Sequence, residues 1–166
     1  MPIILVGGGS RSGKSSYALQ IARERGARLG YIATAQAFDE EMAERIRIHR
    51  QERGADFSTF EEPLDIARIL REQEAALDAV IIDCLTLWLS NHLLLDREPP
   101  ASQLLDAAAA SPITCILVTN EVGCGIVPDN AVARRFRDLA GRLNQQAAAR
   151  ASEVYWTAFG IPLRLK

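Results

Sequence analysis

The stretch GGGSRSGKSS at residues 7–16 follows the short apolar run 3–6 and precedes a helical pattern. Four residues separate Gly8 from the Gly13-Lys14 pair, which is the spacing of a phosphate-binding P-loop. Glycines let the backbone turn so that successive N–H groups point at phosphate oxygens. A helix that begins near Lys14 adds the positive end of its dipole. The stretch therefore predicts a strand, a phosphate-binding loop and a helix, in that order.

We expect this loop to bind a nucleoside triphosphate. The Lys14 amine would contact the β- and γ-phosphates, and the Ser15 hydroxyl would ligate a magnesium ion. A second magnesium candidate is Asp83, which ends the continuous apolar run 79–82. Such a run is typical of a buried parallel strand, and P-loop proteins hold magnesium through an acid at its carboxyl end, directly or through water.

The composition of the whole chain is that of one ordinary globular domain, residues 1–166, with 48% hydrophobic and 24% charged residues. The formal net charge of −2 leaves no basic excess, which argues against nucleic acid as a partner. The three cysteines, Cys84, Cys115 and Cys124, have spacings that fit neither a disulfide framework nor a zinc site. We expect a cytoplasmic protein without a signal peptide or a membrane span.

Apolar runs and helical patterns alternate along the rest of the chain. After the first strand and helix, the sequence predicts strands at 29–33, 57–60, 79–83 and 114–119. It predicts helices at 39–53, 63–77, 85–95, 102–110 and 130–151. Pro63 would open the second of these helices, and His92 would be structural in the third. We therefore expect an α/β fold with a mostly parallel central sheet flanked by helices, and a C-terminal hairpin, 153–158 and 161–165, at the sheet edge.

The run RIRIHRQER places several arginines around His49. One interpretation of this run is structural, because Met42, Ile46 and His49 share one helix face at i, i+4 and i+7 and would form a packed stripe. Glu44 and Arg47 would then be an ordinary surface ion pair. Lone histidines are more often structural than catalytic, so the residues alone favour this interpretation.

The other interpretation of the run is functional. A cluster of guanidinium groups beside a histidine suits a phosphate-bearing substrate, and Arg50 and Arg53 have no acidic partner toward the start of the helix. Nearby positive charge disfavours imidazolium, so the ring of His49 would be neutral and nucleophilic at pH 7.

Five segments carry a resemblance to a known family. GGGSRSGKS, YIATAQ, DEEMAERIRIHR, IIDCLTLWLSN and TNEVGCGIVPDNAVARRFRDLAGRLNQ occur in this order and cover nearly the whole chain. Together they closely resemble the bifunctional adenosylcobinamide kinase/adenosylcobinamide-phosphate guanylyltransferases of cobalamin nucleotide-loop assembly. Many families share the P-loop, but the histidine segment and the last segment are specific to this one. The resemblance implies the RecA-like branch of P-loop NTPase folds and a homo-oligomer, in this family a homotrimer.

The resemblance also implies two reactions. In the first, ATP or GTP phosphorylates the aminopropanol hydroxyl of adenosylcobinamide. In the second, GTP guanylylates an active-site histidine with release of pyrophosphate, and the GMP passes to adenosylcobinamide phosphate to give adenosylcobinamide-GDP. His49 stands at the position of that histidine, so the resemblance reverses the interpretation that the residues alone favour.

By the same motif matching, the catalytic residues would be His49 and Lys14. Ser15 and Asp83 would hold Mg²⁺, and Glu61 and Asp83 would be the acidic contacts to nucleotide or magnesium. The full set of nucleotide-binding residues that the resemblance implies is Gly8, Gly9, Ser10, Arg11, Ser12, Gly13, Lys14, Ser15, Ile32, Ala33, Thr34, Arg50, Gln51, Glu52, Arg53, Glu61 and Asp83.

Two other hypotheses compete with this one. The first is a monofunctional P-loop kinase for another small hydroxyl substrate, in which His49 is structural and no covalent nucleotide forms. The second is a non-catalytic, nucleotide-gated oligomeric module of RecA type, which would need a basic surface that the near-neutral charge does not support. The sequence also departs from the family pattern at Ile48, where relatives can carry a second histidine, and at Cys124, where a Met or Leu is expected.

Overall fold

The computed structural model describes residues 2–37 and 39–166, without the side chains of Arg45 and Glu52. Glu52, one of the expected nucleotide-binding residues, therefore lies outside the described side chains. The described residues form a seven-stranded sheet in the order β3-β2-β4-β5-β1-β6-β7. The strands are β1 (Ile3–Gly8), β2 (Leu29–Ala33), β3 (Phe57–Glu61), β4 (Ala79–Asp83), β5 (Thr114–Asn120), β6 (Glu153–Ala158) and β7 (Ile161–Arg164).

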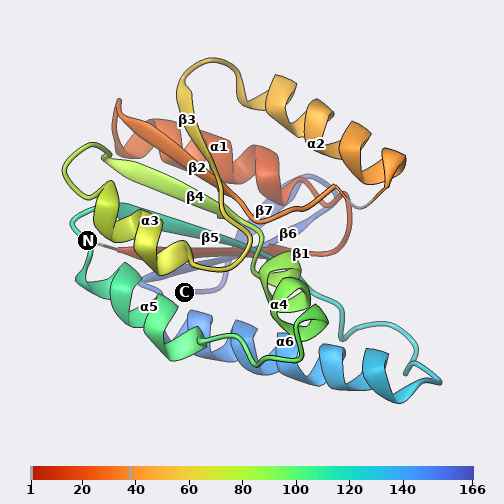
Figure 1. The fold of residues 1–166 in the computed structure, drawn as a ribbon. Helices are drawn as coiled ribbons and strands as arrows, with labels where there is room; N and C mark the ends of the chain where they lie inside the picture. The colour runs from red at the N-terminus through yellow and green to blue at the C-terminus, as the bar shows by residue number, and fades with distance from the viewer. Residues whose placement is uncertain (1, 38) are drawn as a thin grey trace.

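The sheet is parallel except at its last strand. β1 pairs in parallel with β5 on one side and β6 on the other, and β2 likewise lies between β3 and β4. β7 is antiparallel to β6 and forms the predicted C-terminal hairpin at the sheet edge (Figure 1). The predicted mostly parallel sheet with this hairpin is confirmed, and the predicted strand ranges 29–33 and 79–83 match β2 and β4.

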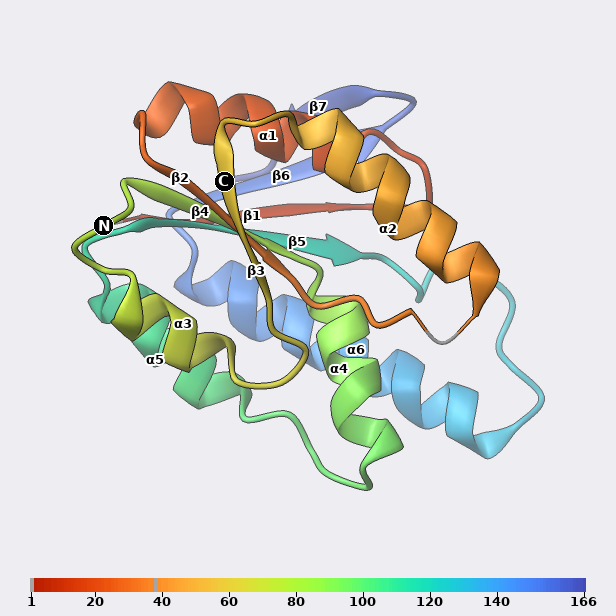
Figure 2. The ribbon, with the colours of Figure 1, turned by 45° about the horizontal axis from the view of Figure 1, so that its top comes forward.

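Helices cover both faces of the sheet, as Figure 1 and Figure 2 show. One face carries α1 (Lys14–Arg25) and, at its margin, α2 (Glu40–Arg53). The other carries α3 (Ile66–Glu72), α4 (Leu85–Leu94), α5 (Ala101–Ala110) and α6 (Ala131–Arg150). None of the helices in the described ranges combines the length and apolar character needed to cross a membrane.

Successive residues of the central strands feed two separate cores. In β1, Ile3 and Leu5 join the cluster under the helices α3 to α6, whereas Ile4 and Val6 join the cluster under α1. Because side chains alternate across a strand, a strand buried on both faces must be continuously apolar. This requirement explains why β1, β4 and β5 read as unbroken apolar runs.

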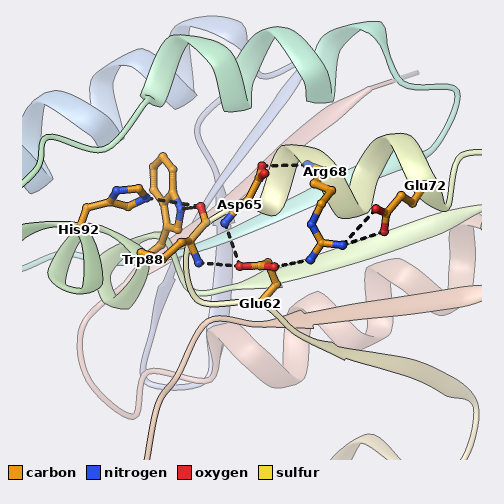
Figure 3. Close-up of polar contacts among 7 residues, drawn as sticks. Glu62, Asp65, Arg68, Glu72, Trp88 and His92 are labelled. Atoms are coloured by element: carbon orange, nitrogen blue, oxygen red, sulfur yellow. Dashed lines mark hydrogen bonds and ion pairs between the residues drawn. The ribbon is translucent and has the colours of Figure 1, made fainter. Parts of the chain in front are cut away.

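Side chains of two helices hold the segment between β3 and α3 (Figure 3). The Glu62 carboxylate accepts the backbone N–H groups of Leu64 at 3.0 Å and Asp65 at 2.9 Å. Arg68 of α3 donates to the other Glu62 oxygen at 2.6 Å. From α4, Trp88 Nε1 donates to the Leu64 carbonyl at 2.7 Å. The hydrogen-bond partner of this carbonyl is therefore a side chain and not a backbone N–H of a helix.

The predicted helix 63–77 is therefore wrong at both ends. Asp65 caps α3 by accepting the backbone N–H of Arg68 at 3.1 Å, and the helix begins at Ile66 instead of Pro63. It ends at Glu72, and the following turn still carries Leu77 into the core, where its side chain is 7% exposed.

His92 lies in the core, as the sequence predicts. Its ring meets Trp88 edge to face with 5.0 Å between centroids, and its Nε2 lies 3.4 Å from the Leu64 carbonyl oxygen (Figure 3). Burial lowers the pKa of His92, which keeps the ring neutral at neutral pH. The neutral ring fits its place beside an indole and a carbonyl.

The hydrogen bond between Trp88 and Leu64 allows a test of how the segment before α3 is held. We expect Trp88→Phe to lower the free energy of unfolding by about 2–3 kcal/mol, because it removes a buried hydrogen bond and leaves a small cavity. Urea unfolding followed by circular dichroism measures the loss. Trp156→Phe, at a half-buried position, is the matched control and should cost clearly less. Equal losses in the two variants would contradict this account of the segment.

Candidate functional site

The carboxyl ends of three neighbouring central strands meet at one edge of the sheet. β4 ends at Asp83, β5 at Asn120 and β1 at Gly8, and the loop between β1 and α1 begins there (Figure 2). In open α/β sheets this edge is where ligands bind. The structure thus brings the predicted phosphate loop and the predicted magnesium carboxylate to the same edge.

The conformation of the loop between β1 and α1 requires glycine at both ends. Gly13 precedes the first residue of α1 with φ 95°, in the left-handed region that favours glycine. A Cβ at Gly8 would lie 2.4 Å from Thr157 Oγ1, which is too close for any other residue. Lys14 is 8% exposed, and its Nζ donates to the Gly9 carbonyl at 2.8 Å. Burial lowers the pKa of Lys14, and the charge of Asp83 opposes this effect.

The C-terminal hairpin holds the loop from the side. Thr157 Oγ1 donates to the Gly7 carbonyl at 3.1 Å and lies 2.8 Å from Ser12 Oγ. The Gly160 N–H donates to the Ser12 carbonyl at 3.0 Å. A Cβ at Gly13 would lie only 3.0 Å from Gly160 Cα, so the turn of the hairpin packs directly on the loop. The sequence analysis missed Thr157, because a threonine in a late strand carries no local signal of this role.

The two expected magnesium residues lie in contact. Ser15 Oγ donates to Asp83 Oδ2 at 3.0 Å, and the same oxygen accepts the Tyr31 hydroxyl at 2.6 Å. Hydroxyl and carboxylate oxygens are the ligands that Mg²⁺ prefers, so the residues present fit the ion. The described residues contain no group of three or more His, Cys, Asp or Glu side chains that could hold a metal.

The residues at the end of β2 support the site from within. Ile32 is fully buried in the core, and Ala33 is half-buried. Thr34 is also buried, and its Oγ1 accepts the Cys84 N–H at 2.7 Å and donates to the Cys84 carbonyl at 2.9 Å. Asn91 Nδ2 donates to the Thr34 carbonyl at 2.8 Å. The side chains of Ile32 and Thr34 therefore fix the edge of the sheet and face away from solvent.

Helix α2 presents its histidine to solvent. Met42 and Ile46 are half-buried, but the side chain of His49 is exposed, so the predicted packed stripe does not extend to His49 and that interpretation is wrong. The predicted ion pair of Glu44 with Arg47 is confirmed, with 2.6 Å between Oε1 and Nη2.

Two arginines connect the end of α2 to the sheet. Arg50 forms an ion pair with Glu61, the last residue of β3. Arg53 is 3% exposed, lies 4.0 Å above the ring centroid of Tyr31 and donates from Nε to the His49 carbonyl at 3.0 Å. Its Nη1 is buried without a hydrogen-bond partner among the described residues. Burial lowers the pKa of Arg53, and the opposite charges of Asp83 and Glu61 work against this effect.

The loop after β5 lies beside the phosphate loop. The backbone N–H of Glu121 donates to the Gly8 carbonyl at 3.0 Å. Arg137 of α6 donates to the Gly123 carbonyl at 2.7 Å and so ties this loop to the helix. Cys124 is exposed, and Ile126 is 96% exposed. The loop therefore begins beside the phosphate loop and carries exposed side chains farther along.

The chain is similar over nearly its whole length to proteins of one known family. The family model described as cobinamide kinase / cobinamide phosphate guanyltransferase matches residues 4–165. The bifunctional adenosylcobalamin biosynthesis protein CobP of Pseudomonas aeruginosa is 45% identical over 166 residues, which are 98% of this chain and 96% of the relative. The protein CobU of Escherichia coli, of the same description, is 38% identical over 181 residues, with 99% of each chain covered.

The likeness to solved structures concerns the fold. The crystal structure of the RadB recombinase superposes with a TM-score of 0.51 at 17% identity, covering 93% of this chain and 73% of that one. The predicted fold class is confirmed as an α/β P-loop NTPase fold of RecA-like type.

The contact between Thr157 and the phosphate loop generates a prediction. Thr157→Val keeps the shape of the side chain but removes the hydroxyl that contacts Gly7 and Ser12. We expect the dissociation constant of a non-hydrolysable GTP analogue to rise about 5- to 10-fold. The loop loses two hydrogen bonds that contribute about 1 kcal/mol each, and part of this loss weakens the binding of the analogue. Titration with a fluorescent analogue measures it. Thr157→Ser keeps the hydroxyl and should bind like the wild type, and a comparable loss in this variant would refute the role of the hydroxyl.

Proposed function

This chain belongs to the cobinamide kinase / cobinamide phosphate guanyltransferase family, and we propose that it performs both reactions with the residues described above. It is a transferase of cobalamin biosynthesis, as are its relatives by name. The substrates would be adenosylcobinamide and adenosylcobinamide phosphate, with ATP or GTP as phosphoryl donor and GTP as guanylyl donor. The observation that carries the proposal is that His49 is exposed on the arginine-rich helix α2. Arg53, the last residue of this helix, packs on Tyr31, whose hydroxyl donates to Asp83.

The kinase reaction would take place at the phosphate loop. Backbone N–H groups of residues 8–15 and the Lys14 amine would hold the triphosphate, because they line the turn between β1 and α1. Lys14 is held over the loop by the Gly9 carbonyl, so little side-chain entropy is lost when it contacts a phosphate. The substrate hydroxyl oxygen would form the new bond to the γ-phosphorus, and the nucleoside diphosphate would leave.

Ser15 and Asp83 would hold Mg²⁺, because their side-chain oxygens meet at the carboxyl end of β4. When bound there, the ion would neutralise charge on the phosphate oxygens. Glu61 would supply its acidic contact from the end of β3, two strands away from β4, where it pairs with Arg50.

The guanylyl transfer would use His49. A ring nitrogen of His49 would form a bond to the α-phosphorus of GTP, and the bond to the β-phosphate oxygen would break with release of pyrophosphate. A phosphate oxygen of adenosylcobinamide phosphate would then take the GMP and restore the free histidine. Arg50 and Arg53, with Gln51, would line this site, and guanidinium groups there would stabilise the charge that develops on the transferred group.

We also propose a homo-oligomer, with the trimer as the expected form. Large apolar side chains stand in solvent at Ile126 (96% exposed), Val132 (78%) and Leu94 (68%). Exposed apolar side chains of this size support an interface with another copy. Static light scattering of the purified chain gives the count of subunits.

The covalent intermediate separates this proposal from a plain kinase. We expect label from GTP radiolabelled at the α-phosphate, but not at the γ-phosphate, to remain on the wild-type protein in an acid-labile, alkali-stable form. His49→Ala should lose this label and keep γ-phosphoryl transfer to adenosylcobinamide, because the phosphate loop is intact. Ile48→Ala, at the exposed neighbouring position, is the control and should keep both. Absence of α-label on the wild type, with γ-transfer preserved, would overturn the guanylyl-histidine and leave a monofunctional kinase.

A further inference from the structure

We infer that Tyr31 is a positioning residue that serves both halves of the site: its hydroxyl orients Asp83 toward the metal, and its ring seats Arg53 at the end of the histidine helix. The inference rests on the proposed function and assigns a role to a residue outside the P-loop and histidine motifs. Tyr31 lies in β2, between the strand that ends in Asp83 and the strand that ends in Glu61.

The first contact of Tyr31 is with the metal carboxylate. Its hydroxyl donates to Asp83 Oδ2 at 2.6 Å, the length of a strong hydrogen bond to a charged group. Ser15 donates to the same oxygen, whereas no side chain among the described ones donates to Oδ1. Two donors on one oxygen fix the plane of the carboxylate, and the other oxygen remains for Mg²⁺ or a water bound to it. Burial and the nearby charge of Asp83 raise the pKa of Tyr31, so its hydroxyl stays a donor.

The second contact of Tyr31 is with the end of α2. The Arg53 guanidinium carbon lies 4.0 Å from the ring centroid, and the Arg53 side chain is almost fully buried. A cation this close to a desolvated aromatic face is held by attraction to the π-electrons of the ring. Arg53 Nε donates to the His49 carbonyl at 3.0 Å, so the position of the arginine also fixes the backbone of the proposed nucleophile.

The surroundings of Tyr31 leave it little freedom. Tyr31 is 5% exposed, and Phe57 packs edge-on against its ring with 6.5 Å between centroids. Arg23 of α1 donates to the Arg53 carbonyl at 3.1 Å and lies over the Phe57 ring at 5.5 Å. The ring and the hydroxyl are thus held from opposite ends, and a tyrosine supplies both a stacking face and an O–H donor at the far end of its ring.

The two contacts of Tyr31 are separable by mutation. Tyr31→Phe removes only the hydroxyl, and Tyr31→Leu removes the hydroxyl and the ring. Tyr155→Phe is the matched control, because the Tyr155 hydroxyl also donates to a carboxylate, Glu153 Oε2 at 2.7 Å, away from the phosphate loop.

The affinity for the metal is measured without turnover. Mn²⁺ is titrated into each variant saturated with a non-hydrolysable GTP analogue, and the free ion is followed by electron paramagnetic resonance. We expect Tyr31→Phe and Tyr31→Leu to raise the dissociation constant of Mn²⁺ about tenfold, and Tyr155→Phe to leave it unchanged. An unchanged constant in Tyr31→Phe, or an equal change in Tyr155→Phe, would overturn the metal half of the inference.

The effect of the Tyr31 ring on helix α2 is measured at saturating Mg²⁺, as the amount of label that His49 takes from GTP radiolabelled at the α-phosphate. Tyr31→Phe should then label His49 like the wild type, since its ring still holds Arg53. Tyr31→Leu should stay about tenfold or more below the wild type while its γ-phosphoryl transfer recovers with Mg²⁺. Full recovery of label in Tyr31→Leu would overturn the ring half. If Tyr31→Leu does not fold, Tyr31→Met, which also lacks the ring and the hydroxyl, replaces it with the same expected results.

The outcomes also distinguish this inference from the proposed function. If the wild type takes no label from the α-phosphate, the guanylyl-histidine fails, and the proposed role of the Tyr31 ring fails with it. The Mn²⁺ titration still decides whether the Tyr31 hydroxyl orients Asp83 toward the metal. If the wild type takes the label and the Tyr31 variants behave like Tyr155→Phe, the proposed function stands and the inference fails.

Discussion

The carboxylate of Asp83 is the point on which the predicted site depends. One oxygen of this side chain accepts hydrogen bonds from Ser15 at the start of α1 and from Tyr31 in β2. It can do so because β4 lies between β2 and β5 in a parallel sheet, and parallel strands end at the same edge. The same topology places Gly8 and the phosphate loop one strand beyond β5. A single acidic residue therefore joins the loop expected to bind phosphate to the strand that leads toward the histidine helix.

The phosphate loop also depends on residues from the far end of the chain. The hairpin β6–β7 contacts it through Thr157 and through the turn at Gly160. These contacts join residues about 145 positions apart, so the loop reaches this geometry only when β6 has paired with β1. Glycine at positions 8 and 13 is needed here for close approach as well as for turning. The geometry of the binding loop is thus fixed by contacts with the distant strand β6 as well as by its own sequence.

The sequence allows the local features of this molecule to be predicted, and the tertiary ones much less. The P-loop, the ranges of β2 and β4, and the choice of Ser15 and Asp83 as magnesium candidates follow from motif spacing and apolar runs. The start of α3 does not follow, since Asp65 and the side chains of α4 override the proline signal. Tyr31 and Thr157 carry no local pattern, because their roles arise from pairing with distant strands. The exposure of His49 also contradicts a periodicity that is correct as far as Ile46.

The two proposed reactions make opposite demands on exposure, and the residues proposed for them lie on different elements, the phosphate loop after β1 and His49 on α2. Phosphoryl transfer needs a triphosphate held without freedom. Hydrogen bonds from Lys14 and Thr157, and one to Asp83, hold the phosphate loop, while its residues Ser10 and Arg11 are exposed. A covalent histidine must meet first GTP and then a second, bulky substrate, so it needs exposure. Helix α2 satisfies this need because it contributes little to either core and is attached at its end by Arg50 and Arg53. The contact of Arg53 with Tyr31 then links the carboxylate of the phosphate site to the helix that carries the exposed nucleophile, which is why one buried tyrosine can affect both chemistries.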